Sequence, residues 1–188
     1  MKRSSLLLLV LLAIGNPIMA QKKGSPKADP LKQSVQQSID AQFADMTELS
    51  DKIWSFEEIA FQETQSSAAL SAYAEKLGFK VTRGVGEIPT AFIAEFGEGK
   101  PVIGFLAEYD ALPGIAQQAV PEKKTIEGKA GGHACGHHLF GAASVAAGVS
   151  IKKLIEEKKL KGQFYSCSAP AWAKLGLAFN FEDSWQLH

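Results

Sequence analysis

The residues best suited to chemistry lie in one short segment, GGHACGHH at 131–138. It holds three of the four histidines and one of the two cysteines of this 188-residue chain. In an extended segment, the side chains of Cys135 and His137 point to the same side. Thiolate and imidazole both bind zinc and similar divalent metals, and Gly136 allows a tight turn around an ion. The spacing therefore predicts a metal site to which Cys135 and His137 contribute.

Cysteine and histidine also serve in other chemistries, and the residue types alone do not exclude these alternatives to a metal site. His133 and His137 would lie about 13 Å apart in an extended chain, so both reach one ion only if the loop curls. Cysteine and histidine also form the nucleophile and base of thiol catalysis. In an oxidising compartment, a disulfide between Cys135 and Cys167 is a third possibility.

The sequence before this segment predicts helices that could support it. Residues 31–54 carry apolar side chains at steps of three and four, which predicts an amphipathic helix with one buried face. A second helix is expected over 63–77, with Thr64 or a neighbouring hydroxyl as its cap. Gly78 is expected to end that helix.

Two adjacent carboxylates, Glu57 and Glu58, lie between the two expected helices. Neighbouring residues on a helix point in different directions, so these two are not placed to work as an acid and base pair. The sequence predicts instead that both are solvated surface residues.

Three strand-like segments follow, at 79–82, 90–96 and 101–109. The turn sequence GEGK at 97–100 predicts that the last two form a β-hairpin. The almost wholly apolar run PVIGFLAEY at 101–109 predicts a sheet that is covered on both faces. Glu108, Tyr109 and Asp110 come at the end of this run, where α/β enzymes place polar groups.

A loop rich in glycine and proline, at 111–132, leads to the segment with the histidines. Loops of this length inside a compact domain are often functional. A helix over 138–160 and a strand over 163–167 are expected next. The order of helices and strands predicts an α/β fold, built as a three-layer sandwich.

The ends of the chain and its charge bear on location and partners. A basic start, a leucine-rich run at 4–14 and the small residue Ala20 predict a cleaved signal peptide over 1–20, followed by a flexible lead-in over 21–30. The apolar run is too short for a stable membrane anchor, so we expect export to the periplasm or the outside. Twenty basic and twenty acidic residues give no reason to expect a nucleic-acid partner.

Longer segments around these residues resemble the amidohydrolase branch of peptidase family M-20, close to its aminobenzoyl-glutamate hydrolase group. The resemblance extends from about Ile53 to Leu160, more than half of the chain. EYDALPG and HACGH, with their spacing, are its specific elements. The resembling segments are IWSFEEIAFQETQSS at 53–67, EKLGFKVTRGVGEIPTAFIAEFGEGKPVIGFLAEYDALPG at 75–114 and GGHACGHHLFGAA at 131–143.

The resemblance implies a catalytic domain of the zinc-peptidase type with two divalent metals, zinc or manganese. It also implies hydrolysis of the amide bond of small N-acyl or aminobenzoyl amino acids. By position, Cys135 matches the thiolate ligand and His137 the neighbouring imidazole ligand. Asp110 matches the catalytic acid that orients ligands or the metal-bound water. Glu108 stands where other branches have a metal-binding histidine, and is a further candidate ligand.

The two other histidines of the segment match no ligand of the family. His138 occupies a position where relatives often carry asparagine or aspartate, and is expected to begin the helix that follows. His133 is expected to line the pocket of the site.

The resemblance stops after Gly162. Relatives continue with a segment like Pro-Ala-Glu-Glu-Gly-Gly, whose first glutamate is the general base and whose second binds metal. Here residues 168–188 read SAPAWAKLGLAFNFEDSWQLH, without such a pair. The later histidine ligands and the lid domain, through which oligomers could form, are missing too.

We therefore expect an incomplete domain. Residues 31–167 would be the N-terminal part of a metallohydrolase catalytic domain, and 168–188 a divergent tail from a truncated or frameshifted gene. The full-length activity would be that of a metal-dependent amidohydrolase, and the alternative is a non-catalytic, exported, metal-binding remnant of such an enzyme.

Overall fold

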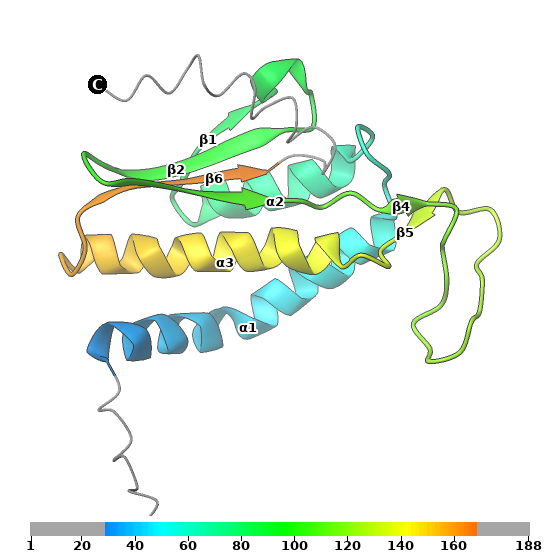
Figure 1. Cartoon of the computed structure of the whole chain (residues 1–188), viewed down its shortest axis with the longest axis horizontal. Coiled ribbons are helices and arrows are strands. Elements are labelled where there is room, and N and C mark those ends of the chain that lie inside the picture. Colours follow the sequence, from blue (N-terminus) through cyan, green and yellow to red (C-terminus); the bar gives the residue numbers. More distant parts are fainter. Residues whose placement is uncertain (1–28, 169–188) are drawn as a thin grey trace, which may run out of the picture.

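The computed structural model describes residues 29–168, in which three helices pack with a four-stranded sheet (Figure 1). This arrangement confirms the predicted α/β class. The predicted signal peptide, all of the predicted tail except Ser168, and all but the last residues of the lead-in lie outside the described residues. The helices and strands, in chain order, are α1 (Pro30–Phe56), α2 (Thr64–Lys76), β1 (Lys80–Arg83), β2 (Phe92–Glu98), β3 (Val102–Ala107), β4 (Leu112–Pro113), β5 (Gly131–Gly132), α3 (His137–Glu156) and β6 (Gly162–Ser168), with a short 3₁₀ turn η1 (Val85–Glu87) between β1 and β2.

The strand order of the sheet is β1-β2-β6-β3, so the predicted hairpin is wrong. Strands β2 and β3 do run in opposite directions, but β6 lies between them, antiparallel to β2 and parallel to β3. Gln163 at the start of β6 donates its backbone N–H to the Pro101 carbonyl at 2.9 Å. The turn sequence at 97–100 correctly predicted a reversal of direction. It could not show that β6, about sixty residues later in the chain, would lie between β2 and β3.

The helices lie on one face of the sheet, and α1 packs mainly against α3 (Figure 1). Leu70 of α2, Val145 of α3 and Phe164 of β6 meet in one core cluster. The expectation that both faces are covered is not met within residues 29–168, because the side chain of Leu106 is 55% exposed. Strand β3 is also an edge strand of the described sheet, with β6 as its one neighbouring strand there.

Helix α3 passes close to the sheet because small residues line its buried face. A Cβ atom at Gly148 would come within 2.6 Å of the Phe164 ring. With 20 residues, α3 is long and apolar enough to cross a membrane, judged by length and composition alone. Packing between α1 and the sheet accounts for that composition, as is usual for the core helix of an α/β fold.

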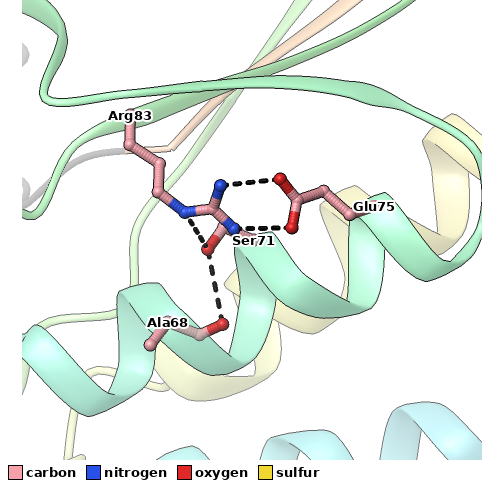
Figure 2. A network of polar contacts seen from close by, with 4 residues as sticks. All are labelled: Ala68, Ser71, Glu75 and Arg83. Carbon is pink, nitrogen blue, oxygen red and sulfur yellow. Dashed lines mark hydrogen bonds and ion pairs between the residues drawn. The ribbon is translucent and has the colours of Figure 1, made fainter.

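A polar network joins the end of β1 to α2 (Figure 2). The Arg83 guanidinium donates to both carboxylate oxygens of Glu75, at 2.7 and 2.9 Å, and its Nε donates to the Ser71 hydroxyl at 3.1 Å. The Ser71 hydroxyl in turn donates to the Ala68 carbonyl at 3.3 Å. This bidentate pairing fixes the strand against the helix that precedes it.

The solvated pair predicted at Glu57 and Glu58 is wrong for both residues. The Glu58 carboxylate accepts the backbone N–H groups of Gln65 and Ser66, at 2.9 and 2.8 Å, and so caps the start of α2. The side chain at the N-cap position itself makes no capping bond, so the predicted hydroxyl cap is not used. Glu57 is 6% exposed and forms an ion pair with Lys129 at 3.0 Å.

Candidate functional site

The end of β3 and the first residue of α3 bring three of the predicted site residues together. The His137 ring lies between two carboxylates, with Nε2 3.0 Å from an oxygen of Glu108 and Nδ1 3.0 Å from an oxygen of Asp110. Nδ1 also lies 3.1 Å from the Asp110 backbone carbonyl. Strand β3 pairs in parallel with β6, and α3 packs against both strands. This arrangement places these residues together at one edge of the sheet.

The three side chains of this cluster are largely shielded from solvent. The exposed fractions of the side chains are 12% for His137, 19% for Glu108 and 2% for Asp110. A neutral imidazole carries a proton on one nitrogen only. Two oxygen acceptors of Asp110 face Nδ1, so this nitrogen is the natural donor. A ring with its proton on Nδ1 would leave the lone pair of Nε2 free to bind a metal beside Glu108.

The donor set fits a divalent metal at Nε2 of His137. Zinc lies about 2.0–2.2 Å from both imidazole nitrogen and carboxylate oxygen. Two such atoms 3.0 Å apart, as His137 and Glu108 provide, can therefore contact the same ion. Asp110, on the far side of the ring, has the position of a carboxylate that orients a metal-binding histidine. Within residues 29–168, however, no group of three or more His, Cys, Asp or Glu side chains is placed to hold an ion.

Cys135 stands apart from the cluster. It is a free and exposed thiol, so the alternative of a disulfide with Cys167 is not realised. It forms no hydrogen bond to a histidine base within the part of the chain that the structure describes. Its role as a thiolate ligand stays a prediction.

The other two histidines form a pair of their own. The ring centroids of His133 and His138 lie 4.8 Å apart, and His138 is the second residue of α3. Burial, together with the neighbouring His138, lowers the pKa of His133 to about 4. His133 is therefore neutral near pH 7. Both of its ring nitrogens are buried and have no hydrogen bond of good geometry in the described part.

Similarity to known proteins extends over most of this chain. No family model matches the chain. It is 43% identical over 136 residues to a subunit of p-aminobenzoyl-glutamate hydrolase from Escherichia coli (strain K12), covering 71% of this chain and 28% of that protein. It is 30% identical over 146 residues to Xaa-Arg dipeptidase of Homo sapiens, covering 71% of this chain and 30% of the dipeptidase.

Solved structures agree with this relationship. A Bacillus subtilis protein, described as a dinuclear metal-binding peptidase from the M20 family, aligns with a TM-score of 0.55 and 27% identity, over 68% of this chain and 36% of that one. Over part of its length, this chain is therefore similar to a member of the M20 peptidase family. A protein from methicillin-resistant Staphylococcus aureus shares the fold, with a TM-score of 0.61 and 20% identity over 74% of this chain and 35% of that one. The chain spans about a third of the length of these relatives and solved structures.

Sequence reasoning missed one buried carboxyl that interacts with Asp110 of the cluster. Glu63 is fully buried, and burial raises its pKa, with a smaller contribution from the charge of Asp110. One carboxyl oxygen of Glu63 accepts the Phe61 backbone N–H at 2.9 Å. The only sequence signal at Glu63 was its position just before a helix. An acidic residue at that position ordinarily interacts favourably with the helix dipole.

Proposed function

We propose that this chain carries part of the active site of an exported, metal-dependent amidohydrolase. The full-length protein would hydrolyse the amide bond of N-acyl or aminobenzoyl amino acids. The observation that carries the proposal is His137 held between Glu108 and Asp110, in a chain 43% identical to part of an aminobenzoyl-glutamate hydrolase. The sequence of residues 1–20 supports export.

Each residue of the cluster has a distinct part in this proposal. Asp110 accepts the Nδ1 proton of His137, which fixes the tautomer and makes Nε2 a better donor to a metal. Glu108 and Nε2 of His137 would hold a divalent metal such as zinc or manganese, and Cys135, two residues before His137, would add a thiolate. A divalent ion bound there supplies polarisation of the scissile carbonyl and a water of lowered pKa. The buried position of Asp110 keeps solvent from competing for the histidine proton.

The ligand assignment can be tested by metal affinity, without any assay of activity. Asp110→Asn should weaken the binding of zinc about 10- to 100-fold in a competition titration with a chelating dye. His137→Gln should abolish binding at the same site. Asp40→Asn, on an exposed part of α1, is the matched control and should leave affinity unchanged. Equal affinities of the wild-type and Asp110→Asn proteins would show that Asp110 does not support a ligand.

A second candidate is a non-catalytic metal-binding remnant. It is favoured by the lack of a complete ligand group within residues 29–168 and of the Glu-Glu pair expected after β6. Amidase activity separates the two, measured on the 188-residue chain and on a version rebuilt through the missing segment. Activity of the unmodified chain would exclude the remnant. A rebuilt protein that cleaves no N-acyl amino acid with zinc, manganese or cobalt would exclude the proposed reaction.

A further inference from the structure

The loop over 114–130, between β4 and β5, projects from the molecule beside the end of α1 (Figure 1). Lys129, near the end of this loop, forms an ion pair of 3.0 Å with Glu57, the residue that follows α1. We propose that Lys129 is a positioning residue. Its ion pair fixes the start of the segment that carries Cys135, and so holds the thiol within reach of a metal bound by His137. The proposal rests on the proposed function and adds to it a residue outside the ligand cluster.

Glu57 combines two features that are unfavourable unless something compensates for them. Its backbone is left-handed, with φ of 55°, a conformation that residues other than glycine rarely adopt. Its side chain is almost fully buried, and a buried carboxylate is costly without a partner. Lys129 supplies that partner. Strained backbone of this kind is concentrated at functional sites, which points to a role for the ion pair beyond the surface of α1.

The last turns of α1 contact the chain at further points after Lys129. A Cβ atom at Gly131 would come within 3.0 Å of the Glu57 carbonyl oxygen, so backbone packs directly on backbone there. The backbone of Ile53 interacts with the ring of His133. Glu57 and His133 line one pocket of about 270 Å³. The path of the chain from Lys129 to His133 therefore follows the end of α1.

The other attachment of this loop is short. Strands β4 and β5 pair over two residues each, and the Gly114 backbone N–H adds a hydrogen bond of 2.9 Å to the Ala130 carbonyl. A long loop gains much conformational entropy when it is released, so a short pairing constrains it only locally. The ion pair of Lys129 with Glu57 is an independent attachment, on the side of the loop that leads to Cys135.

The position of the Cys135 thiol depends on where the anchored part of the chain ends. The Ala134 backbone N–H donates to the Gly132 carbonyl at 3.1 Å, and Gly136 adopts φ of 81°, so the chain turns on both sides of Cys135. His137 is fixed separately, as the first residue of α3. A shift of the chain before the turn therefore moves the thiol without moving the imidazole. Loss of the ion pair would separate the two ligands.

The test follows the thiolate directly, with cobalt in place of zinc in the full chain. Cobalt accepts the same thiolate and imidazole ligands, and a bound thiolate gives a charge-transfer band in the near ultraviolet. Cys135→Ser identifies that band by removing it. We expect Lys129→Met to lose most of the band and to bind zinc about tenfold more weakly. Glu57→Gln should act in the same direction, whereas Lys129→Arg keeps the charge and should retain both properties.

Two control variants separate positioning from general destabilisation. Lys123→Met makes the same substitution at another exposed residue of the loop, and should leave the band unchanged. Gly148→Ala crowds the Phe164 ring in the core, so it should destabilise the fold and still keep the band. Circular dichroism checks that each variant is folded. In EDTA, amide hydrogen exchange over 131–136 should be faster in Lys129→Met than in the wild-type protein.

Three results would overturn the proposal: a wild-type protein without the thiolate band, a band unchanged in Lys129→Met, or exchange over 131–136 unchanged in that variant. An equal loss of the band in Gly148→Ala would overturn it too. A wild-type protein that lacks the band but binds zinc through His137 would leave the ligand cluster of the proposed function intact. A rebuilt protein that hydrolyses no amide would leave the role of Lys129 intact, because none of these measurements uses activity.

Discussion

The cap that Glu58 forms on α2 leads to a quantitative prediction. Its carboxylate accepts two backbone N–H groups, from Gln65 and Ser66, together with the Ser66 hydroxyl at 2.8 Å and the Thr64 hydroxyl at 3.1 Å. Loss of a capping side chain costs about 0.5–2 kcal/mol, and loss of a charge beside the helix N-terminus adds about 0.3–1 kcal/mol. We expect Glu58→Ala to lower the free energy of unfolding by about 2 kcal/mol at pH 7.

Glu58→Gln separates the charge from the hydrogen bonds, because it keeps one acceptor oxygen. It should cost about 1 kcal/mol. Burial alone would raise the pKa of Glu58, but hydrogen bonds from Gln65 and Ser66 outweigh it and lower the pKa below its usual value. The stabilisation is therefore complete above the pKa of the unfolded chain, about 4.3, and is lost as the pH falls through the folded pKa.

Urea-induced unfolding followed by circular dichroism provides the measurement, at a series of pH values. The difference between the wild-type protein and Glu58→Gln should shrink as the pH is lowered through the carboxyl range. Glu48→Ala, at an exposed position of α1, is the control and should change stability by less than about 0.5 kcal/mol. A loss of that small size in Glu58→Ala, or a difference that does not depend on pH, would refute the capping argument.

Three further predictions concern packing, burial and the free thiol. Gly148→Ala should destabilise the protein by about 1–3 kcal/mol in urea unfolding, because its Cβ atom would meet a phenylalanine ring of β6 at 2.6 Å. Gly104→Ala, whose Cβ atom would meet no described atom within 4 Å, should be nearly neutral, and equal effects of the two would contradict this. Lys129→Met should cost about 1–2 kcal/mol, because it leaves the buried Glu57 carboxylate unpaired; an unchanged unfolding midpoint would argue against that. Cys135 should react with a thiol reagent in the folded protein as fast as an exposed model thiol, whereas protection until unfolding would show that it is bonded.

Much of the fold follows from local patterns. The apolar spacing over 31–54 corresponds to α1, which ends at Phe56, and Gly78 closely follows the end of α2 with φ of +83°. Helix periodicity and glycine at helix ends depend on neighbours within one or two turns, so the sequence shows them directly. The register of β6 between β2 and β3 depends on segments sixty residues apart, and no local rule contains it.

The candidate site likewise has features that local sequence patterns predict and features that only the folded structure shows. The spacing of Glu108 and Asp110 after an apolar strand, and of Cys135 and His137 before a helix, was sufficient to predict a metal-binding chemistry. It could not show that His137 lies between the two carboxylates while Cys135 remains exposed. Side-chain direction in a loop depends on the packing of both elements that it joins.

The sequence by itself determined the element types, the α/β class, the family resemblance and the residue types of the site, because these depend on near neighbours and on matched motifs. Only the tertiary structure decided that Glu58 caps α2, that β6 separates the expected hairpin and that His133 lines a pocket. Each of these outcomes depends on a contact that sequence spacing does not encode. Such contacts are selected by how the whole core packs.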